Sequence, residues 1–308
     1  MFASRNNGLI IIGLLTTVFL WGGNNAGVKF LVHSWPPMMV GSSRFLAAGL
    51  LMLALLRWTH WLGEGFPPTP DIGRSLWWRG GLSLAAYVAV FNLALRYTSA
   101  SHVALYLAAS PVWALLWEGR TTSSRMEMTR RYGAALLALA GVLILVLPVL
   151  KSSGGSLRGE LLGLTASLLW TNHGRQCRVL GQTLSGAAVS AHSMFRAGVI
   201  LLPFALLEIS GKPLIWEAKL FWVQAYCIVG GGILAFAFWN NALRHWKTSE
   251  VYLFINLIPL STMLWARFCL DEKITGNFWF AMALIVAGVA IGQARWEKFF
   301  GRAWLPAD

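Results

Sequence analysis

The hydrophobic pattern of the chain consists of long apolar runs separated by short polar stretches. A helix that spans the hydrocarbon core of a bilayer needs about 20 mostly apolar residues. Such runs predict ten membrane-spanning helices, at 9–31, 38–57, 77–97, 101–118, 131–149, 159–178, 187–208, 220–243, 249–268 and 275–295. Most connections are short, and only 58–76, with Pro67, Pro68 and Pro70, is expected to be a sizeable loop. The predicted fold class is an all-α integral membrane protein.

One pattern, N-x-A-L-R-x(4)-S-x-V-x-L-x(5)-P, occurs twice in the chain. It covers Asn92 to Pro111 and recurs 148 residues later, from Asn240 to Pro259. Weaker matches at similar offsets extend the repeat, for example Leu20-Trp21 with Leu169-Trp170, and Ala140-Gly141-Val142 with Ala287-Gly288-Val289. Residues 1–150 and 151–308 are therefore predicted to be two five-helix repeats within one membrane domain. Because five is odd, the second repeat enters the membrane from the opposite side, which gives an inverted repeat.

The orientation of the helices follows from the distribution of basic residues. Most of the 25 Lys and Arg residues fall on the side of the N-terminus, whereas Arg44 and Arg196 lie inside predicted helices. Cytoplasmic loops carry an excess of Lys and Arg, so both termini are predicted to be cytoplasmic. The first apolar run follows Arg5 as in a signal peptide, but no cleavage site follows it, and we expect a retained helix.

Composition supports a membrane protein and excludes several other classes. Of the 308 residues, 56% are hydrophobic and 12% are charged, and the mean hydropathy is +0.59; soluble domains have about 25% charged residues. The net charge of +13 does not indicate nucleic acid, because the basic residues lie between apolar runs. The three cysteines are scattered singly, and no metal, cofactor or enzyme motif is present. The expected partners are the bilayer and a small-molecule substrate, and the expected state is a monomer.

An inverted repeat has a functional meaning. Two equal halves of opposite direction can exchange conformations and open a shared midplane site first to one side and then to the other. Alternating-access transport is therefore the leading hypothesis. A channel or a membrane scaffold, made by simple duplication, stays open as an alternative of another class.

Several motifs resemble those of the EamA-like branch of the drug/metabolite transporter superfamily. They are W-G-x-N-x(4)-K from Trp21 to Lys29, P-P-x(6)-R-F from Pro36 to Phe45, A-L-R-Y-T-S-A from Ala94 to Ala100, and N-L-I-P ending at Pro259. The resemblance covers nearly the whole chain, although the family's commoner Gly-Glu is Asp271-Glu272 here. It implies ten helices, a bacterial cytoplasmic (inner) membrane location and export of small metabolites, often amino acids. Exporters of aromatic amino acids are the nearest analogue; drugs, sugars or nucleotide derivatives are the alternative substrates.

Polar and aromatic residues near the bilayer midplane are the candidates for substrate binding, because a deep polar group needs a cavity or a partner. Trp21 and Asn24 in the first segment correspond to Trp170 and His173 in the sixth. By symmetry these two clusters are expected to meet and to suit a zwitterion or an apolar side chain. Interhelical hydrogen bonding and packing are the structural alternative.

The third, fourth, eighth and ninth segments add Tyr87, Phe91, Tyr106, Trp113, Trp239, Asn240 and Asn256 as candidates. Tyr87 is the most informative of these, because its counterpart in the other half is Ala235 and an asymmetric residue indicates substrate rather than scaffold. Asn240 matches Asn92 across the repeat, so that holding a helix end is an equal possibility for it.

Prolines and charges inside the segments complete the candidates. Pro111 and Pro259 are expected in the middle of helices, where proline kinks the helix and can provide a hinge or a passive bend. Arg196 is matched with Leu46 and is the preferred partner of a substrate carboxylate, whereas a structural role is equally open for Arg44. All twelve acidic residues lie at segment ends or in loops, so facilitated diffusion or exchange is predicted rather than carboxylate-based proton coupling.

Overall fold

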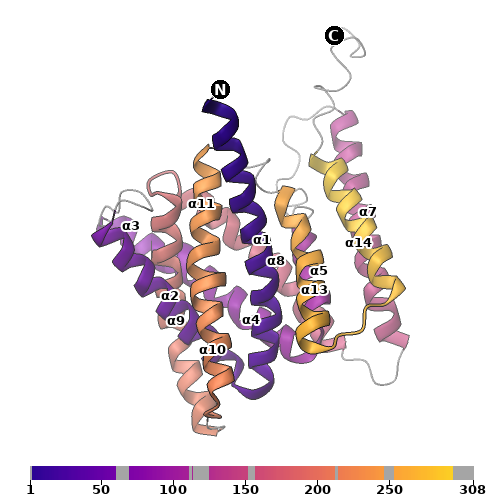
Figure 1. Cartoon of the computed structure of the whole chain (residues 1–308). Coiled ribbons are helices and arrows are strands. Elements are labelled where there is room, and N and C mark those ends of the chain that lie inside the picture. Colours follow the sequence, from indigo (N-terminus) through magenta and orange to yellow (C-terminus); the bar gives the residue numbers. More distant parts are fainter. Residues whose placement is uncertain are drawn as a thin grey trace.

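The structure, a computed structural model, describes residues 2–59, 69–110, 113, 125–151, 157–211, 214–245 and 253–293. The elements in chain order are α1 (Phe2–Ser34), α2 (Pro37–Trp58), α3 (Pro70–Ser75), η1 (Leu76–Leu82), α4 (Ser83–Tyr97), α5 (Ala100–Ala108), α7 (Arg125–Lys151), α8 (Leu157–Leu180), α9 (Gly186–Gly211), α10 (Ala218–Tyr226), η2 (Cys227–Leu234), α11 (Ala235–His245), η3 (Leu253–Leu257), α13 (Ile258–Leu270) and α14 (Gly276–Gln293). The described residues contain no strand, which confirms the all-α class (Figure 1).

Five helical stretches are long and apolar enough to cross a membrane: Gly8–Ser34, Pro37–Trp58, Pro70–Tyr97, Gly186–Gly211 and Ala218–Trp239. Helical residues also occur in the other five predicted segments, but ten spans stay a prediction. Large apolar side chains point outward; Leu207 is 71% exposed and Phe268 is 81% exposed. An apolar exterior of this kind fits a lipid environment and not water.

The helices form a central group and an outer pair. Within the central group, α1 packs against α11 and α13, α4 packs against α8, and α5 contacts both α8 and α13. The outer pair, α7 and α14, lies at one edge of the molecule (Figure 1). Gly141 allows this pairing, because a Cβ there would lie 2.8 Å from the carbonyl oxygen of Ala281. Helix α1 begins and α14 ends at the same face of the molecule (Figure 1).

Helices α2 and α9 meet through a reciprocal glycine contact. A Cβ on Gly49 would lie 2.3 Å from the backbone nitrogen of Phe195, and a Cβ on Gly198 would lie 2.5 Å from the backbone nitrogen of Leu46. The pairs Gly49/Gly198 and Leu46/Phe195 are both 149 residues apart. Two patches that contact each other reciprocally are expected at a pseudo-two-fold axis. In this register Leu46 corresponds to Phe195, one residue away from its sequence-based match with Arg196.

The glycine-rich parts of the third and eighth segments are π-helical, which the sequence did not predict. Helix η1 contains Gly80 and Gly81, and η2 contains Gly230 to Gly232. At each of these glycines a neighbouring helix packs closely. A Cβ on Gly81 would lie 2.7 Å from Cβ of Arg196, and one on Gly231 would lie 2.5 Å from Oδ1 of Asn24. Wider π-helical turns are frequent at functional sites, and η2 borders the cavity described below.

Two expectations about local structure are wrong. The expected loop at 58–76 already contains helix from Pro70 onward, because Pro70 suits the first helical turn and Asp71 lies at its positive end. Pro259 is not in the middle of an α-helix but in the first turn of α13, directly after the 3₁₀-helix η3. Proline costs little there, because the amide group it lacks has no intrahelical acceptor. Its hinge role stays a prediction, and Pro111 lies outside the described residues.

Candidate functional site

A cavity lies between the central helices, and its wall is mainly apolar, with several aromatic rings. Its lining includes the rings of Trp21, Tyr87, Phe91, Trp170 and Phe236. These side chains come from α1, α4, α8 and α11, so elements of both predicted repeats contribute to one site. The cavity therefore brings together Trp21, Tyr87, Phe91 and Trp170, four of the aromatic residues that the sequence singled out.

One half of the aromatic wall is built around Tyr87. Its ring centroid lies 5.0 Å from that of Trp170 and 5.5 Å from that of Phe91. Tyr87 and Phe91 are four residues apart on α4 and so lie on the same helical face. Tilted rings at these distances attract each other, and they form a continuous surface against which an apolar or aromatic group can pack.

The other half of the wall is fixed by Trp21. The indole Nε1 of Trp21 donates a hydrogen bond of 3.0 Å to the carbonyl oxygen of Gly231 in η2. Its ring lies 5.2 Å from the ring of Trp239, which is buried behind it and is absent from the lining. Trp239, a sequence-based candidate, therefore positions Trp21 in this conformation.

The polar part of the lining consists chiefly of Asn24, Asn25 and Arg44. The guanidinium of Arg44 donates a hydrogen bond of 3.1 Å to Oδ1 of Asn24, and it lies 4.4 Å from the centre of the Phe45 ring. Nδ2 of Asn25 donates to Oγ1 of Thr262 at 3.1 Å and so ties α1 to α13. Asn24 was a predicted site residue. For Arg44 the sequence left open whether its role is substrate binding or structural, and the structure places it in the cavity wall.

Three predicted residues are absent from the lining, and their polar groups contact other helices. The hydroxyl of Tyr106 donates to Glu160, and Nε1 of Trp113 donates to Oγ of Ser167 at 2.9 Å. Nδ1 of His173 lies 2.8 Å from Oγ of Ser83. The sequence predicted the depth of these side chains but not the helix face on which they lie.

Arg196 is also absent from the lining of the cavity. Its guanidinium contacts Nδ1 of His192 at 3.0 Å and the carbonyl oxygen of His192 at 3.3 Å. It also lies 5.4 Å from the ring of Trp77. The preference for Arg196 over Arg44 as the carboxylate partner is therefore not supported by its position. The side chains of Asn240 and Asn256 lie outside the described residues.

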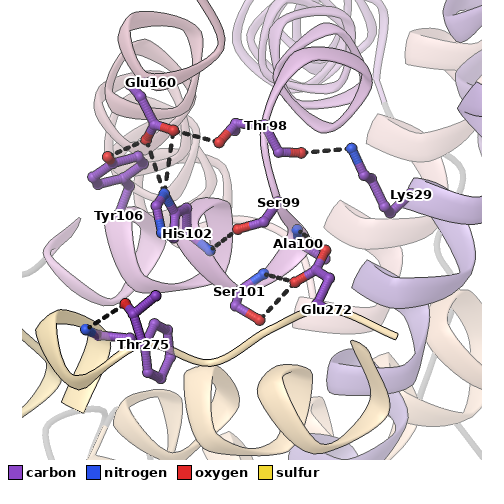
Figure 2. A network of polar contacts seen from close by, with 11 residues as sticks. Lys29, Thr98, Ser99, Ala100, Ser101, His102, Tyr106, Glu160, Glu272 and Thr275 are labelled. Carbon is purple, nitrogen blue, oxygen red and sulfur yellow. Dashed lines mark hydrogen bonds and ion pairs between the residues drawn. The ribbon is translucent and has the colours of Figure 1, made fainter. Parts of the chain in front are cut away.

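A network of polar contacts ties four elements together where α1 ends (Figure 2). We call it the carboxylate network; its members are Lys29, Thr98, Ala100, Ser101, His102, Tyr106, Glu160 and Glu272. Glu160, in the first turn of α8, is only 3% exposed and accepts hydrogen bonds from the hydroxyls of Thr98 and Tyr106. Nδ1 of His102 lies 3.2 Å from its carboxylate. These contacts attach α8 to α5 and to the end of α4.

Glu272 extends the carboxylate network to the connection before α14. Its carboxylate accepts hydrogen bonds from the backbone amide of Ala100 at 2.8 Å and from the hydroxyl of Ser101 at 2.9 Å. Both residues open α5, where unpaired amides and the helix dipole favour a negative charge. Lys29 connects α1 to the carboxylate network, because its Nζ donates hydrogen bonds to the carbonyl oxygens of Leu95 and Thr98, each at 2.7 Å.

Sequence reasoning missed the carboxylate network. It placed Glu160 and Glu272 at segment ends and used this position only to argue against carboxylate-based proton coupling, without asking which groups they contact. The signal that could have found them is local: Thr98, Ser101 and His102 place several hydrogen-bonding side chains in one short connection, and their partners must then come from other helices.

Comparisons with known proteins point to a single family. The model of the EamA-like transporter family matches residues 8–147 and again residues 157–291. A probable amino-acid metabolite efflux pump of Escherichia coli is 25% identical over 314 residues, which cover 96% of this chain and 98% of that protein. An uncharacterized inner membrane transporter of Escherichia coli is 26% identical over 290 residues, with 92% and 90% covered.

Two further comparisons agree with this assignment. An uncharacterized transporter of Archaeoglobus fulgidus is 25% identical over 291 residues, which cover 92% of this chain and 96% of that protein. A crystal structure without a functional description matches with a TM-score of 0.62 at 20% identity, covering 92% of this chain and 96% of that one. The latter likeness concerns the fold alone.

Proposed function

The chain belongs to the EamA-like transporter family, and on that premise we propose that it exports neutral amino acids, aromatic ones included, or related small metabolites by alternating access. The resemblance seen in the sequence is thereby confirmed. The protein is a multi-pass transporter of the inner membrane, and one of its Escherichia coli relatives is named an inner membrane transporter. Family and relatives are named transporters and not enzymes.

The observation that carries this proposal is the central cavity. Its described lining combines aromatic rings with a single buried cation, Arg44, and two amides. A site with an apolar body and a few polar groups suits a small molecule that has one charged end. An amino acid with an aromatic or large apolar side chain has this form, and an amino-acid metabolite efflux pump is one of the relatives.

The carboxylate network supports alternating access as the mechanism. It joins α1, α5, α8 and the α13–α14 connection by hydrogen bonds that can break and reform. We propose that it closes one entrance of the cavity and opens during the transport cycle. Transport then proceeds by facilitated diffusion or exchange in a monomer, with each half contributing one gate.

Counterflow in proteoliposomes tests the proposed function. Vesicles that contain the purified protein are preloaded with unlabelled L-phenylalanine and diluted into a trace of the labelled amino acid. A carrier then accumulates label transiently, a channel only equilibrates it, and a scaffold moves none. If only sugars, drugs or nucleotide derivatives support counterflow in a parallel screen, the amino-acid assignment is wrong and the carrier assignment stands.

A further inference from the structure

Arg44 is a cation without an anionic partner in the wall of the central cavity. The residue is only 5% exposed, and its Nε has no hydrogen-bond partner among the described residues. The hydrogen bond to Asn24 uses one of the five N–H donors of a guanidinium. Its ionisable neighbours are the thiol of Cys227 and the hydroxyl of Tyr87, both of which are neutral at physiological pH.

A buried guanidinium without a partner is unfavourable, because its charge has left water without compensation. Among the described residues that line the cavity there is no Asp or Glu, and no described carboxylate forms an ion pair with Arg44. The neighbouring contacts are neutral: the amide of Asn24 and the ring of Phe45. The protein itself therefore leaves room for an anion at this position.

A carboxylate is the anion that this site fits best. The planar guanidinium binds a carboxylate through two parallel hydrogen bonds. A phosphate would bring up to two negative charges, and the described lining offers one cation for them. The remaining wall includes Trp21, Tyr87 and Trp170 and suits an aromatic or large apolar body.

We propose that Arg44 binds the carboxylate of the transported substrate and that the substrate is recognised as an aromatic or large apolar carboxylate, without a requirement for its amino group. This inference rests on the proposed transport function and specifies its substrate class. The described lining offers no carboxylate to an ammonium group, so the amino group gains no ion pair that matches the one Arg44 offers to the carboxylate. Aromatic 2-oxo acids should therefore bind as well as the corresponding amino acids.

Three probes with the same phenyl ring test the inference on the purified wild-type protein. Phenylpyruvate has the carboxylate alone, L-phenylalanine has carboxylate and ammonium, and L-phenylalanine amide has the ammonium alone. Binding is measured by quenching of tryptophan fluorescence and by thermal shift. Since hydrogen bonds to charged groups contribute about 1.5–3 kcal/mol, the two carboxylates should bind about 10- to 100-fold more tightly than the amide.

Variants then assign this preference to a residue. Arg44→Gln should weaken binding of both carboxylates to the level of the amide, and Arg44→Lys, which keeps the charge but not the planar fork, should retain part of the preference. Arg57→Gln is the matched control, because Arg57 lies exposed on the same helix; its binding should equal that of the wild type. Arg196→Gln tests the competing sequence-based assignment.

Several results would overturn the inference. These are equal binding of acid and amide by the wild type, binding of none of the three probes, an unchanged preference in Arg44→Gln, or loss of the preference in Arg196→Gln alone. Should Arg44→Gln not fold, the wild-type comparison and Arg44→Lys still decide. Counterflow distinguishes failure of this inference from failure of the proposed function. If the protein shows counterflow but binds acid and amide equally, it is a carrier that does not recognise the carboxylate through Arg44.

Discussion

At the residue scale, Trp170 lines the cavity and packs against two other rings, those of Tyr87 and His173. Its ring lies against Tyr87 on one side and 5.9 Å from the ring of His173 on the other. His173 is fixed in turn by its contact with Ser83. Trp170 is thus held by buried neighbours while its ring remains part of the lining, which is the arrangement expected of a rigid contact for an aromatic or apolar ligand.

We expect Trp170→Ala to weaken transport without preventing folding. An aromatic contact contributes about 0.5–1.5 kcal/mol beyond its buried area, so the KM for L-phenylalanine in counterflow should rise about tenfold. Trp170→Phe should retain most of the activity. Trp222→Ala is the control, because Trp222 is 76% exposed on α10. Unchanged kinetics in Trp170→Ala would remove this residue from the substrate site.

Tyr87 and Tyr106 show how far the sequence predicted the candidate site. Both are deep aromatic residues, and the mismatch of Tyr87 with Ala235 correctly drew attention to a residue of the cavity wall. Tyr106 faces α8 instead, where its hydroxyl meets Glu160. Helical periodicity does not say which neighbour a face will meet. Arg196 was preferred over Arg44 because the repeat matched it with Leu46, and this asymmetry likewise does not say which side chain faces the cavity.

At the scale of elements, Glu272 acts on the beginning of α5. Its carboxylate accepts hydrogen bonds from the first two backbone amides of this helix, and it comes from the connection between α13 and α14. In the proposed gate, this contact joins a charge on one element to a helix terminus on another. Such a contact is reversible, because water can replace both partners when the elements separate.

We expect Glu272→Gln to favour opening of the cavity at this end. Hydrogen bonds to charged groups contribute about 1.5–3 kcal/mol and neutral ones about 1 kcal/mol, so the ratio of closed to open molecules should fall roughly fivefold. Cys227 lines the cavity and can report this opening. In a Cys177→Ser, Cys269→Ser background, a membrane-impermeant thiol reagent added to intact cells should modify Cys227 about five times faster in the variant.

Glu208→Gln is the matched control for this experiment. Glu208 also accepts a hydrogen bond from a helix-opening amide, that of Met38 at 2.7 Å, but it joins α9 to α2 and lies outside the carboxylate network. Its replacement should leave the modification rate of Cys227 unchanged. Equal acceleration by both variants would mean that general loosening, and not the contact between Glu272 and α5, controls access.

At the scale of the whole molecule, the sequence predicted the helical class and the apolar segments, because these depend on composition and on the thickness of a bilayer. It did not predict π-helical turns at Gly80 and Gly231, which arise where two helices approach too closely for a side chain. Nor did it predict the ties made by Glu160 and Glu272, since these depend on contacts between segments far apart in the chain.

The orientation of the molecule in the membrane decides which side the carboxylate network faces. Helix α1 begins at the same face at which α14 ends, and α3 lies toward that face, whereas α9 ends at the opposite one (Figure 1). The distribution of Lys and Arg predicts that the first face is cytoplasmic. The carboxylate network, which includes Lys29 near the end of α1, would then lie on the outer side and close the exit for an exported substrate.

Two single-cysteine variants in a cysteine-free background test this orientation. Asp71 in α3 and Glu217 before α10 are both exposed and carry the same charge. In intact spheroplasts, an impermeant maleimide should label Glu217→Cys and should label Asp71→Cys only after the membrane is permeabilised, because the reagent reaches only the outer face. The reverse labelling pattern would place the carboxylate network in the cytoplasm, where it would control entry of the substrate into the cavity instead of its release.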